Sequence, residues 1–324
     1  MLSAIGKGIA ILIGLLICFG VYLYVLSPQT AVDLAQKLER GNAGLEERQV
    51  QVGEFNIHYL DSGKGEPLLM VHGFGADKDN WTRIAADLTG EYRVIAPDLP
   101  GFGASDHPAG KDYSARTQAK RLHAFVEKLG LGAVNIAGNS MGGAIAGAYA
   151  AQYPENTRTL WLLAPADVQS ADTSELRRMI ASGQKNPLLP ATHDEYYALL
   201  GFVFEEEPFI PAPIKYVLAE RAIQREPLLR DIFQQISNED LALETALADS
   251  EVPTLVLWGK QDRLLHVSGA QILADAIPNN TMVVMDNTGH APMIERPQES
   301  AEAFKTFKKN LPAPSQSSET APAS

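Results

Sequence analysis

The apolar positions of this chain gather in short, almost uninterrupted runs through its central part. Strand-like runs of this kind lie at 67–73, 92–98, 133–139, 159–165, 254–259 and 281–286. Residues 48–63 alternate between apolar and polar like a hairpin, and helical stretches such as 114–130 separate most of the runs. Strands that are apolar on both faces and alternate with helices are typical of a mostly parallel, doubly covered sheet. We therefore predict an α/β core over residues 48–165 and 251–310.

Residues 166–250 interrupt this alternation. They contain several prolines and an apolar, aromatic cluster at 196–204 ("YYALLGFVF"), but no convincing strand. We predict that this insertion is helical and forms a cap over the carboxyl edge of the sheet. That edge is where ligands bind in open α/β sheets.

The N-terminal pattern is different, because residues 9–26 hold no charged side chain. As a helix this run would be about 27 Å long, close to the hydrocarbon thickness of a bilayer. We predict a single-span membrane anchor over residues 1–27; a cleaved signal peptide and a buried core helix are the alternatives. No small-x-small cleavage site precedes Val32. Lys7 on the near flank favours a cytoplasmic N-terminus, with the bulk of the chain facing the periplasm from a bacterial inner membrane.

The remaining segments outside the core are short. Residues 28–47 predict a juxtamembrane helix or linker, and the Pro/Ser/Ala-rich tail at 311–324 predicts disorder. Cys18 is the only cysteine, so an intramolecular disulfide is excluded. A homodimer through Gly14 and Gly20 of the anchor is a further hypothesis, although their spacing is not GxxxG.

The charge balance argues against one class of partner, and the absence of certain motifs argues against cofactors and metals. The net charge of −12 and the absence of a basic run exclude nucleic acid, which needs a basic face. The chain has no phosphate-binding loop, no HExxH motif and no Cys/His metal spacing. We therefore expect neither a metal nor a cofactor.

A candidate nucleophile lies where a predicted strand gives way to a predicted helix. Gly138-Asn139-Ser140-Met141-Gly142 matches G-x-S-x-G, the pattern of a nucleophile elbow. In such an elbow the serine occupies a strained turn, and the flanking glycines let strand and helix approach each other. A serine hydroxyl becomes a useful nucleophile only when a base removes its proton.

The base and its orienting acid are expected after the last strands of the sheet. His290 follows the last predicted strand, and Asp262 follows the one before it. The resulting order Ser140, Asp262, His290 is the one that this elbow requires. Asp286 and Asp167 are competitors for the role of the acid.

Acyl transfer also needs donors for the developing oxyanion. The amide of Met141 directly follows the serine, and that of Phe74 lies in a glycine-flanked loop after an early strand. We expect His72 to hold this loop by a side-chain hydrogen bond rather than to act in catalysis. Asp98 is expected to brace the backbone of the site.

Several motifs together carry a family resemblance over residues 48–310: "HGFGADKDNW", "APDLPGFGASD", "GNSMGG", "WGKQDRLLHV" and "GHAPMIERPQ". On these the chain resembles the α/β-hydrolase superfamily, most closely the bacterial family V lipases and the membrane-bound monoacylglycerol lipases and (lyso)phospholipases A. The resemblance implies a mostly parallel eight-stranded sheet flanked by helices, with a helical cap and an N-terminal transmembrane helix. It also implies a catalytic triad of Ser140, Asp262 and His290, with an oxyanion hole at Phe74 and Met141.

The activity implied by this resemblance is cleavage of lipid carboxylic esters at a membrane through an acyl-enzyme, without a cofactor. A general carboxylesterase is an alternative, since it would use the same triad. The carbon–carbon hydrolases of ring-cleavage dienones also carry "GNSMGG", but they typically have tryptophan after the base, where this chain has Ala291. A membrane-tethered scaffold without activity is the non-enzymatic alternative.

Overall fold

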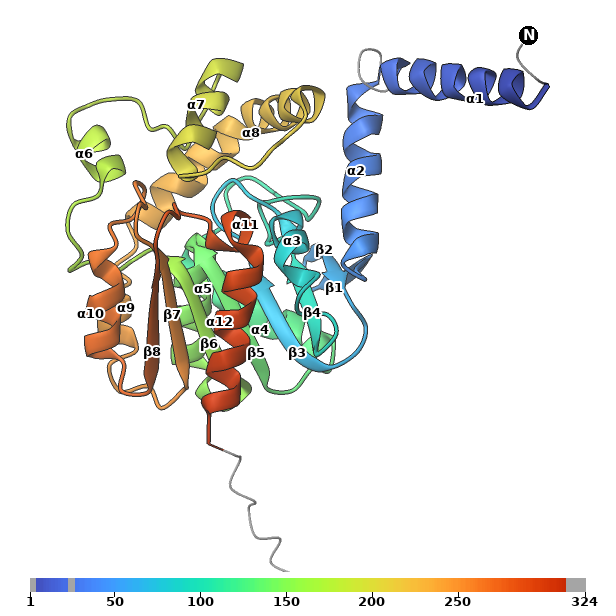
Figure 1. The fold of residues 1–324 in the computed structure, drawn as a ribbon. Coiled ribbons are helices and arrows are strands. Elements are labelled where there is room, and N and C mark those ends of the chain that lie inside the picture. The colour runs from blue at the N-terminus through green and yellow to red at the C-terminus, as the bar shows by residue number, and fades with distance from the viewer. Residues whose placement is uncertain (1–3, 23–26, 313–324) are drawn as a thin grey trace, which may run out of the picture.

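The computed structural model describes residues 4–22 and 27–312 (Figure 1). The predicted disordered tail therefore lies, apart from its first two residues, outside the described residues. The described part contains one β-sheet with helices on both of its faces. It also contains a helical insertion over the carboxyl ends of the parallel strands, and two N-terminal helices.

Eight strands form a single sheet in the order β1-β2-β4-β3-β5-β6-β7-β8. The strands are β1 (Glu46–Val52), β2 (Phe55–Asp61), β3 (Glu66–Val71), β4 (Tyr92–Pro97), β5 (Val134–Ser140), β6 (Thr157–Pro165), β7 (Thr254–Gly259) and β8 (Asn280–Met285). β2 pairs antiparallel with both β1 and β4, and all other pairs are parallel. The mostly parallel eight-stranded sheet predicted from the sequence is confirmed.

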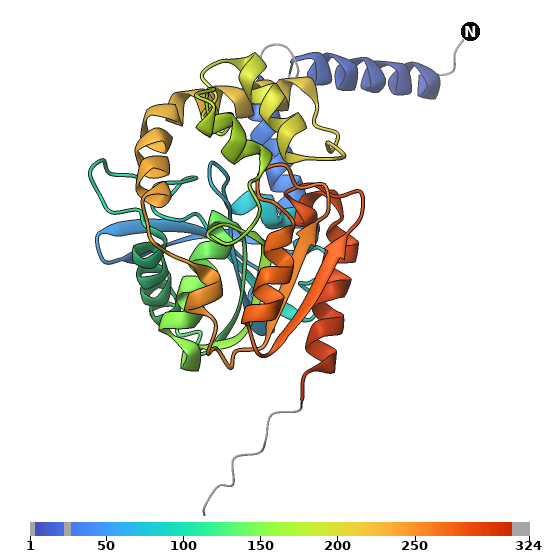
Figure 2. The ribbon, with the colours of Figure 1, turned by 90° about the vertical axis from the view of Figure 1, so that its left-hand side faces the viewer.

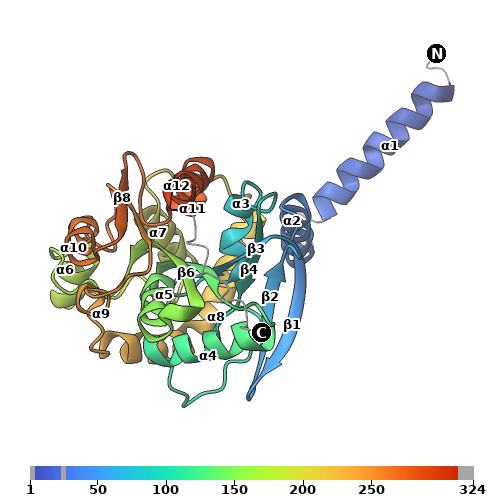
Figure 3. The ribbon, with the colours of Figure 1, turned by 90° about the horizontal axis from the view of Figure 1, so that it is seen from below.

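Helices cover both faces of the sheet, as Figure 3 shows from below. One face carries α4 (Ala115–Lys128), α5 (Met141–Gln152) and α10 (Ser268–Ala276), and the other carries α3 (Thr82–Ala85), α11 (Pro292–Glu295) and α12 (Pro297–Asn310). β7 shows why its sequence is continuously apolar: Val256 and Trp258 pack in one core cluster, whereas Leu255 and Leu257 pack in the other. A strand with one solvated face would have alternated instead.

The insertion between β6 and β7 is helical, as predicted. It contains α6 (Glu175–Ala181), α7 (His193–Val203), α8 (Ala212–Ser237) and α9 (Leu243–Ala246). Figures 1 and 2 show α6, α7 and α8 above the edge of the sheet where the parallel strands end. Loops from this edge, which carry the predicted site residues, therefore lie beneath the insertion.

Two helices precede the sheet: α1 (Ala4–Val21) and α2 (Pro28–Asn42). α2 lies along the core, where Arg40 donates to Asp79 and Glu47 at 2.6 Å each. α1 projects away from the body and leaves Ile11 and Leu15 well exposed (Figure 3). Within 4–22 and 27–312, no helix is both long and apolar enough to cross a membrane. The transmembrane helix predicted over 1–27, part of which falls outside those ranges, is not supported.

Candidate active site

Ser140 occupies a sharp turn at the junction of β5 and α5. Its backbone has φ 56° and ψ −123°, and a positive φ is uncommon for a residue other than glycine. A Cβ on Gly138 would lie 2.1 Å from the carbonyl oxygen of Gly142, and a Cβ on Gly142 would lie 2.2 Å from that of Val71. The two glycines of the G-x-S-x-G pattern are therefore required because backbone passes directly over them.

The structure brings His290 and Asp262 together, although 28 positions separate them in the chain. His290 Nδ1 lies 2.8 Å from Asp262 Oδ2, and both side chains are buried. Since a carboxylate oxygen only accepts, Nδ1 carries a proton, and in the neutral form of the imidazole Nε2 then keeps its lone pair. Nε2 is buried and has no hydrogen-bond partner among the described residues. A lone pair that is directed and unpaired is what a general base needs.

Asp262 is held in place by three further donors. The indole Nε1 of Trp258 donates to Oδ2 at 3.0 Å, and the amides of Leu264 and Leu265 donate to Oδ1 at 2.9 and 3.0 Å. Sequence reasoning missed Trp258, because nothing in the pattern distinguishes a strand tryptophan that orients a carboxylate from one that only packs.

Asn139 links the elbow to the loop of His290. Its amide group donates to the carbonyl oxygens of Leu163 (3.0 Å) and His290 (3.1 Å). The amide of His290 in turn donates to the carbonyl of Val203, at the end of α7, at 2.9 Å. The residue directly before Ser140 thus fixes the loop that carries the histidine, a role that the sequence analysis did not assign.

The loop after β3 runs directly against the elbow. A Cβ on Gly73 would lie 3.3 Å from the Cβ of Ser140, so the next residue, Phe74, is held close to the serine. The Phe74 amide has no hydrogen-bond partner within the described part of the chain. Met141 is the first residue of α5, and amides in the first turn of a helix lack intrahelical acceptors. Two unengaged donors therefore flank Ser140, where the oxyanion hole is predicted.

His72 and Asp98 hold this loop, as the sequence analysis expects. His72 Nδ1 donates to the carbonyl of Gly73 at 2.8 Å, and His72 Nε2 accepts the amide of Leu99 at 3.1 Å. Burial lowers the pKa of His72, so this bridge is made by the neutral ring. The carboxylate of Asp98 accepts the backbone amides of Lys78 and Ala104 at 2.7 Å each.

The two competing acids lie elsewhere. Asp286 is exposed and pairs with Lys260 at 2.7 Å. Asp167 follows β6 with φ 64°, and no hydrogen bond joins its carboxylate to His290. Burial, reinforced by the nearby Glu239 carboxylate, raises the pKa of Asp167 to about 7. Of the three candidates, Asp262 is the one that the fold brings to the histidine.

The raised pKa of Asp167 makes a stability prediction. The folded state binds this proton more tightly than the unfolded state, so the group's contribution to stability is lost as pH rises from about 4 to about 7. Asp167→Asn removes that loss. Asparagine also tolerates the left-handed backbone. The free energy of unfolding of Asp167→Asn minus that of wild type should therefore become more positive as the pH rises through this window. The increase should be on the order of 4 kcal/mol at most. Urea unfolding at pH 5 and pH 8 measures it.

Asp286→Asn is the matched control, because it removes a carboxylate that is exposed and paired with Lys260 rather than buried. If the free energies of unfolding of Asp167→Asn and wild type differed by the same amount at both pH values, the prediction would be contradicted.

The described residues contain no group of three or more His, Cys, Asp or Glu side chains arranged to hold a metal ion. What the fold does assemble is a serine on a strained turn, a buried histidine–carboxylate pair and unengaged backbone amides, all at the carboxyl edge of a parallel sheet. This combination defines a class of α/β proteins with a nucleophile elbow.

Comparison with known families agrees with this class. Residues 66–297 match the α/β hydrolase fold family, and the chain belongs to that family. It is 36% identical to lipase 1 of Psychrobacter immobilis, over 87% of this chain and 91% of the lipase. It is 33% identical to a monoacylglycerol lipase of Mus musculus, with 88% of each chain covered. Among solved structures, a bacterial membrane phospholipase A matches with 41% identity and a TM-score of 0.86, over 94% of this chain and 98% of that one. The resemblance inferred from the motifs is confirmed.

Proposed function

We propose that this chain is a serine hydrolase that cleaves carboxylic esters of lipids at a membrane. The observation that carries the proposal is the buried pair of His290 and Asp262, 2.8 Å apart, on a loop tied to the residue before Ser140. The lipase, monoacylglycerol lipase and phospholipase A names of the relatives support the substrate class.

In the proposed reaction, His290 Nε2 removes the proton of the Ser140 hydroxyl as its oxygen attacks the ester carbonyl. Asp262 holds the imidazole in the tautomer with the proton on Nδ1 and stabilises the imidazolium that forms. The amides of Phe74 and Met141 donate to the negatively charged oxygen of the tetrahedral intermediate. The imidazolium then protonates the leaving alcohol, and an acyl-enzyme on Ser140 remains.

Water completes the cycle through the same groups. His290 takes a proton from the water, which attacks the acyl carbonyl, and returns that proton to Ser140 as the fatty acid leaves. Neither half of the reaction requires a metal or a cofactor. The insertion, residues 166–250, would serve as a cap that shields these steps from bulk solvent.

Membrane association follows from the N-terminal helices in this proposal. α1 exposes Ile9, Ile11, Leu12, Ile13, Leu15 and Phe19. A helix with this many exposed apolar side chains is stabilised when it moves from water into lipid. The gain in free energy is about 0.8 kcal/mol for each CH₂ group that is buried. A substrate dissolved in the bilayer would then be at high local concentration. The periplasmic orientation and the homodimer stay predictions.

Activity-based labelling tests the proposal. Full-length protein is treated with a fluorophosphonate probe and assayed on a monoacylglycerol, a lysophospholipid, a diacyl phospholipid, a short p-nitrophenyl ester and a ring-cleavage dienone. We expect the probe to be found on Ser140 by peptide mass spectrometry and the lipid esters to be preferred. Deletion of residues 1–26 should lower activity on vesicles while sparing the soluble p-nitrophenyl ester.

Absence of labelling in folded wild type would favour the scaffold hypothesis. Preference for the dienone would instead favour a carbon–carbon hydrolase. Vesicle activity that is unchanged by the deletion would contradict the membrane part of the proposal alone.

A further inference from the structure

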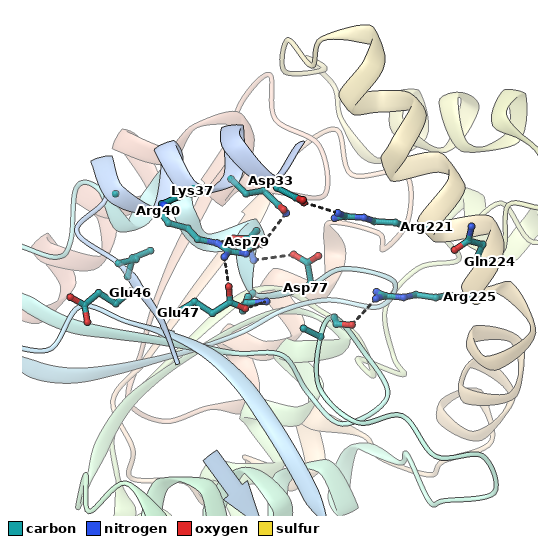
Figure 4. Close-up of a pocket in the computed structure, with 16 residues that line it drawn as sticks. Asp33, Lys37, Arg40, Glu46, Glu47, Asp77, Asp79, Arg221, Gln224 and Arg225 are labelled. Atoms are coloured by element: carbon teal, nitrogen blue, oxygen red, sulfur yellow. Dashed lines mark hydrogen bonds and ion pairs between the residues drawn. The ribbon is translucent and has the colours of Figure 1, made fainter. Parts of the chain in front are cut away.

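A polar cavity of about 970 Å³ lies between α2 and α8 (Figure 4). Its walls come from α2, from the segments at 45–47, 77–79 and 103–104, and from the middle of α8. The volume is in the range of small-molecule sites in proteins. No residue of the proposed triad lines it.

The cationic residues that line the cavity differ in how far carboxylates neutralise them; they are Lys37, Arg40, Lys78, Arg221 and Arg225. Arg40 is fully engaged with Asp79 and Glu47, and Lys78 is paired with Asp98 at 2.7 Å. The arginines of α8 are much less neutralised. Arg225 donates to the carbonyl oxygen of Gly103 at 2.6 Å but has no carboxylate partner among the described residues, and Arg221 reaches Asp33 only at 3.5 Å.

The arginine wall faces a carboxylate that is also unpaired. Asp77 accepts the amide of Asp79 at 3.0 Å and forms no ion pair within the described part of the chain. Figure 4 shows Arg221 and Arg225 extending from α8 toward the side of the cavity that carries Asp77 and Asp33. The cavity thus presents the guanidinium groups of Arg221 and Arg225 on one side and the carboxylate of Asp77, which has no ion-pair partner among the described residues, on the other. This arrangement of charges is complementary to a zwitterion. Guanidinium groups bind phosphate oxygens in particular.

The cavity is connected through the chain to the predicted oxyanion loop. Asp77 follows Phe74 by three residues, which span at most about 11 Å. Gly103 follows Phe102, whose ring contacts that of Phe74 with centroids 6.1 Å apart. This connection through the chain is the basis for placing the charged group of a substrate in the cavity when its ester carbonyl lies at Ser140. On its other side the cavity borders α2, which follows the apolar helix α1.

We propose that this cavity binds the phosphoethanolamine head group of a glycerophospholipid substrate, with the phosphodiester on Arg221 and Arg225 and the ammonium on Asp77. The inference rests on the proposed function, since it names the substrate class of the same site. The same chemistry is present in free glycerophosphoethanolamine, so the test separates the lipid from the soluble compound.

The kinetic arm compares two substrates with the same acyl chain on full-length protein: dihexanoyl phosphatidylethanolamine and 1-hexanoylglycerol. The double variant Arg221→Gln/Arg225→Gln should lower the ratio of their kcat/KM values, phospholipid over monoacylglycerol, by about 10-fold or more, because two charged hydrogen-bond donors to phosphate are lost. Arg221→Lys/Arg225→Lys should restore part of the ratio. Arg158→Gln is the matched control: its side chain also donates to a backbone carbonyl, that of Ala133, but outside the cavity.

Asp77→Asn tests the ammonium site. It should lower the preference for phosphatidylethanolamine over phosphatidylglycerol several-fold, since only the first head group carries an ammonium. A phospholipid-to-monoacylglycerol ratio in the double variant within about twofold of wild type overturns the phosphate site. An unchanged preference in Asp77→Asn overturns the ammonium site.

The binding arm titrates glycerophosphoethanolamine into full-length Ser140→Ala by calorimetry. Weak binding that the double variant abolishes supports the head-group site independently of turnover. Tight binding of the soluble compound together with an unchanged substrate ratio shows that the cavity serves a free phosphodiester, and overturns the lipid assignment. Failure of wild type to cleave either ester contradicts the proposed function instead, and the calorimetric result still decides whether the cavity binds this head group.

Discussion

Replacement of Ser140 by alanine is expected to lower kcat for ester hydrolysis by about 10⁵- to 10⁶-fold, the loss typical of a missing serine nucleophile. The reason is that no acyl-enzyme can form, while the unengaged amides and the bound substrate geometry still give some rate over water. The measurement is steady-state hydrolysis of a monoacylglycerol by full-length protein. Fluorophosphonate labelling should disappear in parallel.

The positive φ at position 140 supplies a control for folding. Ser140→Ala keeps the strain of φ 56°, so its free energy of unfolding should stay close to that of wild type. Ser140→Gly relieves the strain and should be more stable by about 1 kcal/mol, after the greater entropy of its unfolded chain is offset. Activity of the alanine variant above about 1% of wild type would mean that Ser140 is not the nucleophile.

The sheet and the elbow could be predicted from the sequence because their signals are local. A strand covered on both faces must be apolar at every position, as in β7, and so it is recognised without knowledge of its neighbours. Gly138 and Gly142 could be recognised for a similar reason. A Cβ at either position would strike backbone, so the constraint appears directly as a glycine at fixed spacing from the serine.

The supports that Asn139 and Trp258 give to the site could not be predicted, because they depend on which loops meet in space. Asn139 is an unmarked position inside G-x-S-x-G, and its role exists only because the carbonyl of His290 lies 3.1 Å from its amide group. The choice among three aspartates was open for the same reason. Asp167, Asp262 and Asp286 all satisfy the chain order, and only the folded geometry shows which carboxylate meets the ring.

The environment of Asp167 also shows how the fold separates acids that look alike in sequence. Asp262 receives the histidine, an indole and two backbone amides, whereas Asp167 faces the carboxylates of Glu239 and Glu244. An ionised carboxylate is stabilised by donors and destabilised by like charges. The position after β7 therefore supplies a carboxylate with hydrogen-bond donors, whereas the position after β6 places it near like charges.

Asp262→Asn is the substitution that tests this assignment, and it should lower kcat by about 10⁴-fold with little change in KM. An asparagine at 262 has nearly the same shape, but its amide NH₂ can donate to His290 Nδ1. The imidazole would then carry its proton on Nε2, where it cannot accept the proton of Ser140. The loss is therefore one of tautomer rather than of packing, and it also removes the negative charge that stabilises the imidazolium.

Two comparisons separate this effect from a merely structural one. Rising pH should increase the residual activity of Asp262→Asn, because hydroxide can replace the missing base in deprotonating the serine. Asp286→Asn and Asp167→Asn, which alter the other two candidate acids, should each keep activity within about tenfold of wild type at pH 8, since neither carboxylate contacts the imidazole. If Asp167→Asn were instead the variant that lost about 10⁴-fold, the acid would have to be reassigned to the end of β6 and the observed pair of His290 and Asp262 would be structural.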